Sequence, residues 1–197
     1  MSKKFPALTI GTIKPEECIA EYIYLPKVAH LDDSAIEAMI DFRLVKPLIF
    51  NKTELMVAAR RAMELSDLHV ALVLDSHKQL VGLISLEQIL SEKSVKMVES
   101  RRVERKDVQL SSMMTPLKNV AVVDFAKLKY AKVGHVVSTL KTIQRYYILV
   151  IEHDVNNEKS IVRGIFLASH LSRLLDEHIT IDPLQAKPLL ELIKKLK

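Results

Sequence analysis

The chain has 197 residues, of which 49% are hydrophobic and 27% are charged, and its formal net charge is +5. This composition is ordinary for a globular protein and excludes an intrinsically disordered chain; the mild basic excess permits binding of an anion but does not demand nucleic acid. No apolar run approaches the roughly 18 residues that a membrane span needs, and the first residues lack the apolar core of a signal peptide. The single cysteine, Cys18, fits a reducing cytosol, so we expect one or two soluble cytoplasmic domains.

Residues 1–40 are expected to form an N-terminal arm that ends in a short helix. The first 30 residues contain three prolines and show no sustained hydrophobic period. Asp33 or Ser34 can then cap a short helix with its apolar residues on one side.

Residues 41–93 show the order strand, helix, strand, strand, helix. Leu48–Phe50 is a strand candidate, and a helix is expected from Asn51 to about Leu65. Its apolar positions at helical spacing predict the buried face, namely Leu55, Ala58, Ala59 and Ala62. The run His69–Asp75, a polar turn and the run Leu80–Ser85 predict a hairpin, and a short helical pattern follows.

The same order recurs in residues 113–178, and this internal repeat decides the fold prediction. Tyr146–Glu152 and Ile161–Phe166 form the second hairpin, preceded by a helix near Ala131–Ile143. One offset of 77 residues overlays this helix and the first strand of the hairpin on their counterparts. A longer turn then makes the offset 82 at the glycines, Gly82 and Gly164.

Two segments lie outside the repeats. Residues 94–112 are expected to be a solvated, charged linker, because six basic and four acidic residues lie between Glu92 and Asp107. A polyphosphate or nucleic-acid contact is the alternative interpretation of this run. Residues 179–197 form a tail and an amphipathic helix from about Pro188, which we expect to pack on its own domain or on a twin subunit.

Four short motifs appear in a fixed order along the two copies: Asp41–Pro47, Gly82–Ser85, Met114–Pro116 and Arg163–Phe166. In this order they resemble a tandem CBS-domain pair, the Bateman module, over about residues 41–177. The chain is also similar to small stand-alone bacterial CBS-pair proteins. The resemblance implies an α+β fold in which two β-α-β-β-α repeats pack through their sheets about a pseudo-twofold axis. It further implies a regulatory sensor with two clefts that bind adenine nucleotides such as AMP, ADP or ATP.

The family motif places a Ser or Thr hydroxyl at the ligand phosphate and an Asp on the ribose hydroxyls. In the first repeat Ser85 keeps the hydroxyl but Gln88 occupies the Asp position; in the second, Leu167 and His170 replace both groups. Losing one hydrogen bond to a charged group lowers affinity roughly 10- to 150-fold. Neither cleft is therefore complete, and the first is the better candidate.

The candidate ligand contacts are Ser85, Gln88, Arg145, Tyr146, His170 and Lys46. Each has a simpler alternative role. Ser85 can cap the helix that follows it, Gln88 and Arg145 can be solvated, and His170 can be a structural histidine. Tyr146 can stack on a base or remain a half-buried strand residue.

Signals for catalysis are missing from the sequence. The four glycines lie far apart, so no phosphate loop is formed, and no His/Cys cluster has metal-ligand spacing. No nucleophile stands in a recognisable elbow, and we therefore expect a protein that is not an enzyme. The leading hypothesis is a homodimeric ligand sensor with a still unknown protein partner. The alternatives are a constitutive interaction module with degenerate ligand sites and a weak nucleic-acid-binding protein.

Overall fold

The structure of the protein is a computed structural model, which describes residues 30–66, 68–91, 107–154, 159–188 and 191. The N-terminal arm, most of the charged run and the apolar stripe of the expected C-terminal helix lie outside these residues. Those three expectations stay predictions.

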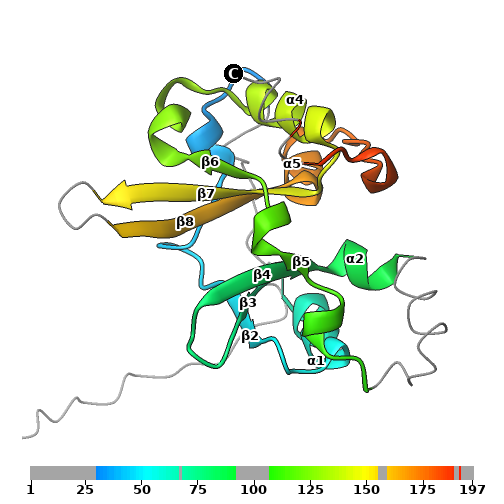
Figure 1. Ribbon diagram of the computed structural model, residues 1–197. Helices are drawn as coiled ribbons and strands as arrows, with labels where there is room; N and C mark the ends of the chain where they lie inside the picture. The colour runs from blue at the N-terminus through cyan, green and yellow to red at the C-terminus, as the bar shows by residue number, and fades with distance from the viewer. Residues whose placement is uncertain (1–29, 67, 92–106, 155–158, 189–190, 192–197) are drawn as a thin grey trace, which may run out of the picture.

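Two four-stranded sheets form the centre of the molecule (Figure 1). The first sheet has the order β2 (Leu48–Asn51), β3 (Val70–Leu74), β4 (Leu80–Ser85) and β5 (Thr115–Pro116). The second has the order β1 (Ile40–Asp41), β8 (Lys159–Leu167), β7 (Tyr147–Asp154) and β6 (Val122–Asp124). The helices are α1 (Met56–Glu64), α2 (Leu86–Leu90), α4 (Val133–Ile143) and α5 (Ala168–Leu175). Short 3-10 helices are η1 (Ala35–Ala38), η3 (Leu110–Ser112), η4 (Leu117–Asn119), η5 (Phe125–Tyr130) and η6 (Pro183–Gln185).

The two sheets have the same internal topology, which confirms the predicted α+β fold with two repeats. In each repeat a helix connects two parallel strands, β2 to β3 through α1 and β6 to β7 through α4. An antiparallel hairpin and a short helix follow in both copies. The aliphatic runs form strands because both faces of each sheet are covered by apolar residues.

Apolar residues form three layers. A central core lies between the sheets and includes Leu83, Leu149 and Ile165, none of which has exposed surface. The outer core of the first repeat lies under α1 and α2, and that of the second lies under α4 and α5. The molecule is thus built as helices, sheet, sheet and helices (Figure 1).

The buried face of α4 is regular and consists of Val133, Val136, Val137, Leu140 and Ile143. The predicted face of α1 was wrong in three of its four residues, since only Ala59 of these is buried. The residues of α1 that are buried are Met56, Ala59 and Met63. The helix begins five residues later than expected. Before it, the Glu54 carboxylate accepts a hydrogen bond of 2.6 Å from the Asn51 N–H and closes a separate turn. Leu55 is therefore extended and 40% exposed, and the helical period starts at Met56.

The edge strands are exchanged between the repeats. β1 stands at the start of the segment assigned to the first repeat but pairs with β8, and β5 stands at the start of the segment assigned to the second but pairs with β4. Neither two-residue strand was predicted. A Cβ atom on Gly82 would lie 2.5 Å from the Thr115 carbonyl oxygen, and one on Gly164 would lie 2.5 Å from that of Ile40. The two glycines are therefore needed for the close approach of the exchanged strands.

The last residues of the expected linker also belong to the first repeat. Val108 and Leu110 are buried in its outer core, and the Leu110 N–H donates a 2.9 Å hydrogen bond to the Glu54 carbonyl. The equivalent bond in the second repeat joins Ala35 to the Ala131 carbonyl, also at 2.9 Å. Each repeat is thus completed by a segment that lies just before the other repeat in the sequence.

Each hairpin contains a bulge just before its glycine. The pairing of β3 with β4 passes from Val73–Gly82 to Leu74–Leu80, which leaves Val81 unpaired. The pairing of β7 with β8 leaves Arg163 in the same position. Because a bulge redirects one side chain, both residues turn away from the central core; Val81 packs on the outer core of its repeat.

Candidate functional site

The hydroxyl expected at the first cleft caps a helix. Ser85 is 1% exposed and stands at the N-terminus of α2, where its Oγ accepts a 3.3 Å hydrogen bond from the Gln88 N–H. The Gln88 Oε1 accepts a 3.0 Å bond from the Ser85 N–H in return. Together these two bonds form a capping box. The role of helix cap, one of the two interpretations of Ser85, is thus what the structure shows.

A chain of polar contacts continues from this cap into the second repeat. Gln88 Nε2 donates a 2.7 Å hydrogen bond to the Thr115 hydroxyl, and the Thr115 side chain lies close enough to the hydroxyl of Tyr147 to affect its pKa. Tyr147 is 5% exposed, and this burial raises the pKa of its hydroxyl to about 12. The phenol therefore stays protonated at neutral pH. Both the oxygen and the nitrogen of the Gln88 side-chain amide are hydrogen-bonded.

Arg145 and Tyr146 lie beside this chain, where the second repeat meets α2. Burial raises the pKa of Tyr146, and the carboxylates of Glu87 and Asp182 raise it further. Tyr146 is therefore close to α2 of the first repeat and to the segment that follows α5. This segment is held in place by a 2.6 Å hydrogen bond from the Asp182 N–H to Gln144 Oε1.

The guanidinium of Arg145 is only partly satisfied. Its Nη2 donates a long hydrogen bond of 3.4 Å to the Lys187 carbonyl. Its Nε is buried and has no hydrogen-bond acceptor in the part of the chain that the structure describes. A buried donor without an acceptor is rare in folded proteins.

The equivalent end of the interface, at the start of α5, is apolar. Leu167 takes the place of Ser85 and forms no side-chain cap, and Ile40 and Val70 take the places of Thr115 and Tyr147. These three side chains are at most 8% exposed. His170, the counterpart of Gln88, lies on α5 with its Nδ1 3.2 Å from Nη2 of Arg173.

The six candidate residues thus lie in three different places in the structure. Ser85 and Gln88 lie together, with Arg145 and Tyr146 across the interface from α2; His170 belongs to the opposite end. Lys46 is exposed between β1 and β2. Sequence reasoning missed Thr115, although it lies in the Met114–Pro116 motif, because its partners come from distant parts of the chain. Ligand binding by any of these residues stays a prediction.

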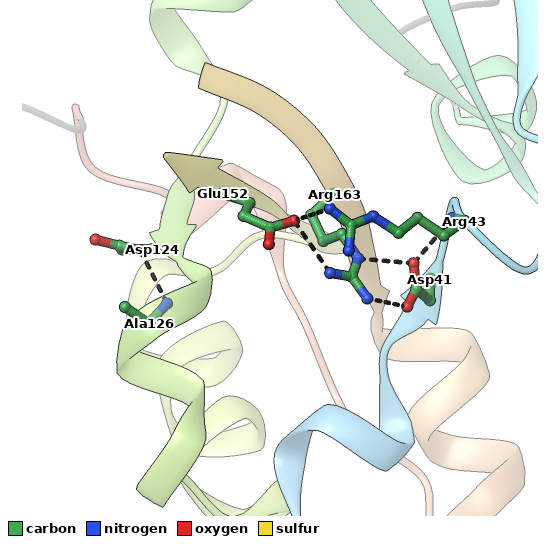
Figure 2. A network of polar contacts seen from close by, with 6 residues as sticks. All are labelled: Asp41, Arg43, Asp124, Ala126, Glu152 and Arg163. Carbon is green, nitrogen blue, oxygen red and sulfur yellow. Dashed lines mark hydrogen bonds and ion pairs between the residues drawn. The ribbon is translucent and has the colours of Figure 1, made fainter. Parts of the chain in front are cut away.

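A second polar cluster lies in the second repeat around the bulged Arg163 (Figure 2). Its guanidinium donates bidentate hydrogen bonds of 2.9 and 2.6 Å to the Asp41 carboxylate and a 3.0 Å bond to Glu152. Glu152 also accepts a 2.8 Å bond from Arg43, and the Phe125 ring lies 4.6 Å from the Arg163 guanidinium carbon.

The charges of this cluster stabilise one another. The hydrogen bonds from Arg163 lower the pKa of Asp41, and those to Asp41 raise the pKa of Arg163. Both groups are therefore ionised at neutral pH, and the pair holds β1 against β8. In the first repeat the positions of Arg163 and Asp41 hold Val81 and Pro116, so the cluster has no counterpart there.

Among the described residues no group of three His, Cys, Asp or Glu side chains could hold a metal ion. Within the same residues, no helix has the length and apolar character that crossing a membrane requires.

The fold has known relatives, although no protein-family model and no curated protein matches the sequence. An uncharacterised conserved protein from Pyrococcus horikoshii matches with a TM-score of 0.53 and 18% identity, over 78% of this chain and 99% of that chain. A CBS-domain containing protein from Agrobacterium tumefaciens matches with a TM-score of 0.51 and 13% identity, over 78% and 98%. A CBS domain protein of unknown function from Thermoplasma acidophilum matches with a TM-score of 0.47 and 19% identity, over 68% of both chains. At these identities the two matches with TM-scores above 0.5 establish the fold alone.

Proposed function

Because the chain has the fold of a tandem CBS-domain pair, we propose that it is a non-catalytic regulatory module. Its ligand is an adenine nucleotide or a similar anionic small molecule, bound at the end of the interface between the repeats where Arg145 and Tyr146 face α2. The module acts in the cytoplasm as a homodimer, and a protein partner responds to the ligand-bound form.

The observation that carries this proposal is the buried Nε of Arg145. An arginine binds phosphate through two parallel hydrogen bonds, which are stronger than bonds between neutral groups. A phosphate oxygen next to Nε would satisfy the donor that the described residues leave without an acceptor. The second bond would replace the long contact of Nη2 with the Lys187 carbonyl.

The carboxylates near Tyr146 fit the rest of a nucleotide. Gln88 cannot take the role of the motif Asp, because its amide is already bonded to Ser85 and Thr115. Glu87 and Asp182 both act on Tyr146 and can accept hydrogen bonds from ribose hydroxyls in its place. The half-buried Tyr146 ring offers a face for the base.

The test is a thermal-shift and calorimetry series with AMP, ADP and ATP at millimolar concentration. A ligand present at about 100 times its Kd adds about 2.7 kcal/mol of stability, so a selective rise in Tm is expected. Arg145→Ala should abolish the rise. The matched control is Arg43→Ala, whose side chain is 57% exposed and distant along the chain, and it should keep the rise. A flat series with the wild-type protein would overturn the proposal.

A second candidate is a constitutive interaction module that has lost ligand binding. It is favoured by the hydrogen bonds that already join Ser85, Gln88 and Thr115 and by the buried Leu167 at the opposite end. This candidate predicts no nucleotide binding by calorimetry and a protein partner whose affinity is unchanged by added nucleotide. Binding of that partner that depends on nucleotide would exclude it.

A further inference from the structure

The second repeat contains a cavity of about 130 Å³ that is separate from the interface between the repeats. It lies between α4, the η5 segment and the outer face of the sheet; α4 covers this face in Figure 1. Its walls are mostly apolar side chains: Val123, Leu128, Ala131, Val136, Ile148 and Phe166. Leu128, Ile148 and Phe166 are at most 3% exposed, so the floor belongs to the outer core.

The cavity follows from two differences between the repeats. Residues 125–132 connect β6 to α4, whereas only residues 52–55 connect β2 to α1, and the longer connection contains η5. The position equivalent to Val123 holds Phe50 in the first repeat, where the ring packs on the outer core. The second repeat thus has a smaller side chain under a longer connection.

The mouth of the cavity is polar. Lys127 of η5 and His135 of α4 line it and are both exposed. His135 Nδ1 accepts a 2.9 Å hydrogen bond from the Lys132 N–H, so the ring carries its proton on Nε2, which is then a donor. A cation and a donor therefore stand above an apolar floor, as in sites that bind an apolar body by one anionic group.

We propose that this cavity binds a small carboxylic acid whose apolar body is no larger than a benzene ring. An apolar cavity of about 150 Å³ stays dry and takes up benzene, so the volume here suits a body of that size. The body lies against Leu128, Ile148 and Phe166, and the carboxylate lies at the mouth near Lys127 and His135. The cavity is independent of the proposed nucleotide site, because neither Arg145 nor Tyr146 lines it.

The test uses benzoate and toluene as probes of the full chain, followed through the methyl NMR signals of Val136 and Ile148. Benzoate should give saturable shifts in the wild-type protein. Val123→Phe, which copies Phe50 of the first repeat, should weaken benzoate binding at least about tenfold by filling the cavity. The same change at the neighbouring, 59% exposed position, Val122→Phe, should leave it unaltered.

Lys127→Ala tests the polar end of the ligand. It should weaken benzoate about two- to fivefold, the range of an exposed ion pair, and leave toluene unaffected. The proposal is overturned if benzoate produces no saturable shift, if the shift survives Val123→Phe, or if toluene binds and benzoate does not. Amide spectra of each variant confirm that it is folded, so that a lost shift reports on the cavity.

Discussion

Arg163 is a charged residue at a position where the first repeat has an apolar one. Its side chain is only 12% exposed, and that of Asp41 is 14% exposed. Removing one partner of a buried ion pair costs more than removing an exposed one, because the remaining charge loses its compensation. We expect Asp41→Asn to lower the free energy of unfolding by about 2 kcal/mol, between the values for exposed and fully buried pairs. Urea denaturation at pH 7 measures it.

Arg43→Ala is the control, since Arg43 bonds the same cluster through Glu152 but is 57% exposed. Arg43→Ala should lower the free energy of unfolding by less than about 1 kcal/mol. Equal losses in the two variants would contradict the role given to Arg163.

The same pair predicts a pH dependence. Arg163 lowers the pKa of Asp41 in the folded state, so the stabilisation is complete above the usual value of 3.8 and is lost as the pH falls through the folded pKa. The difference in stability between the wild type and Asp41→Asn should be constant near neutral pH and shrink below pH 3.8. A difference that persists down to pH 2 would show that the asparagine acts through packing.

Gln88 has two separable contacts, and two variants distinguish them. Gln88→Ala removes both the capping box and the bond to Thr115, and should cost about 1–2 kcal/mol. Gln88→Glu keeps an acceptor for the Ser85 N–H but cannot donate to Thr115 when ionised, so an intermediate loss is expected. If the two variants unfold at the same urea concentration, the bond from Gln88 to Thr115 contributes nothing measurable.

At the scale of elements, local patterns were sufficient for the strands of the two hairpins and for α4. Val70–Leu74 is a continuous aliphatic run, and α4 has a regular helical period, so neither depends on distant residues. The exchange of β1 and β5 could not be predicted, because each strand has only two residues and its partner is set by tertiary packing. The bonds from Arg163 span 122 and 11 residues, which no local pattern encodes.

In the candidate site, too, the local contact could be predicted and the distant contacts could not. The capping of α2 by Ser85 involves neighbours three residues apart and was one of the two roles expected for it. Thr115 comes from β5 and Tyr147 from β7, and only the folded chain brings them near Gln88.

The close pairing of the exchanged strands, β1 and β5, depends on the two glycines beside them. Gly164→Ala would place a Cβ atom 2.5 Å from the Ile40 carbonyl oxygen, so β1 must move. We expect a loss of about 2–3 kcal/mol by urea denaturation, as for other overpacked sites, and a similar loss for Gly82→Ala. Gly134→Ala is the control; its Cβ would lie 3.3 Å from the Leu31 carbonyl oxygen, and alanine favours a helix. Its effect should stay within about 1 kcal/mol, and an equal loss would refute the role of close strand approach.

For the whole molecule, the exchange makes each half of the chain incomplete. A fragment of residues 1–91 lacks β5 and the buried Val108 and Leu110, which complete the first repeat. A fragment of residues 107–197 lacks β1 and the buried Ala35 and Ala38 of η1, which complete the second. Each fragment also exposes its side of the central core.

We therefore expect neither fragment to fold alone and the two to fold together when mixed. The amide NMR spectrum of each separate fragment should show little dispersion, and a 1:1 mixture should give the dispersed spectrum of the intact chain. A fragment of residues 43–116 is the matched comparison with one of residues 41–93, because only the longer one contains all four strands of the first sheet. It should bury the outer core of that repeat and show more dispersion. If residues 1–91 fold without the second fragment, the repeats fold independently of each other. The exchanged strands would then not be what makes the two sheets one cooperative folding unit.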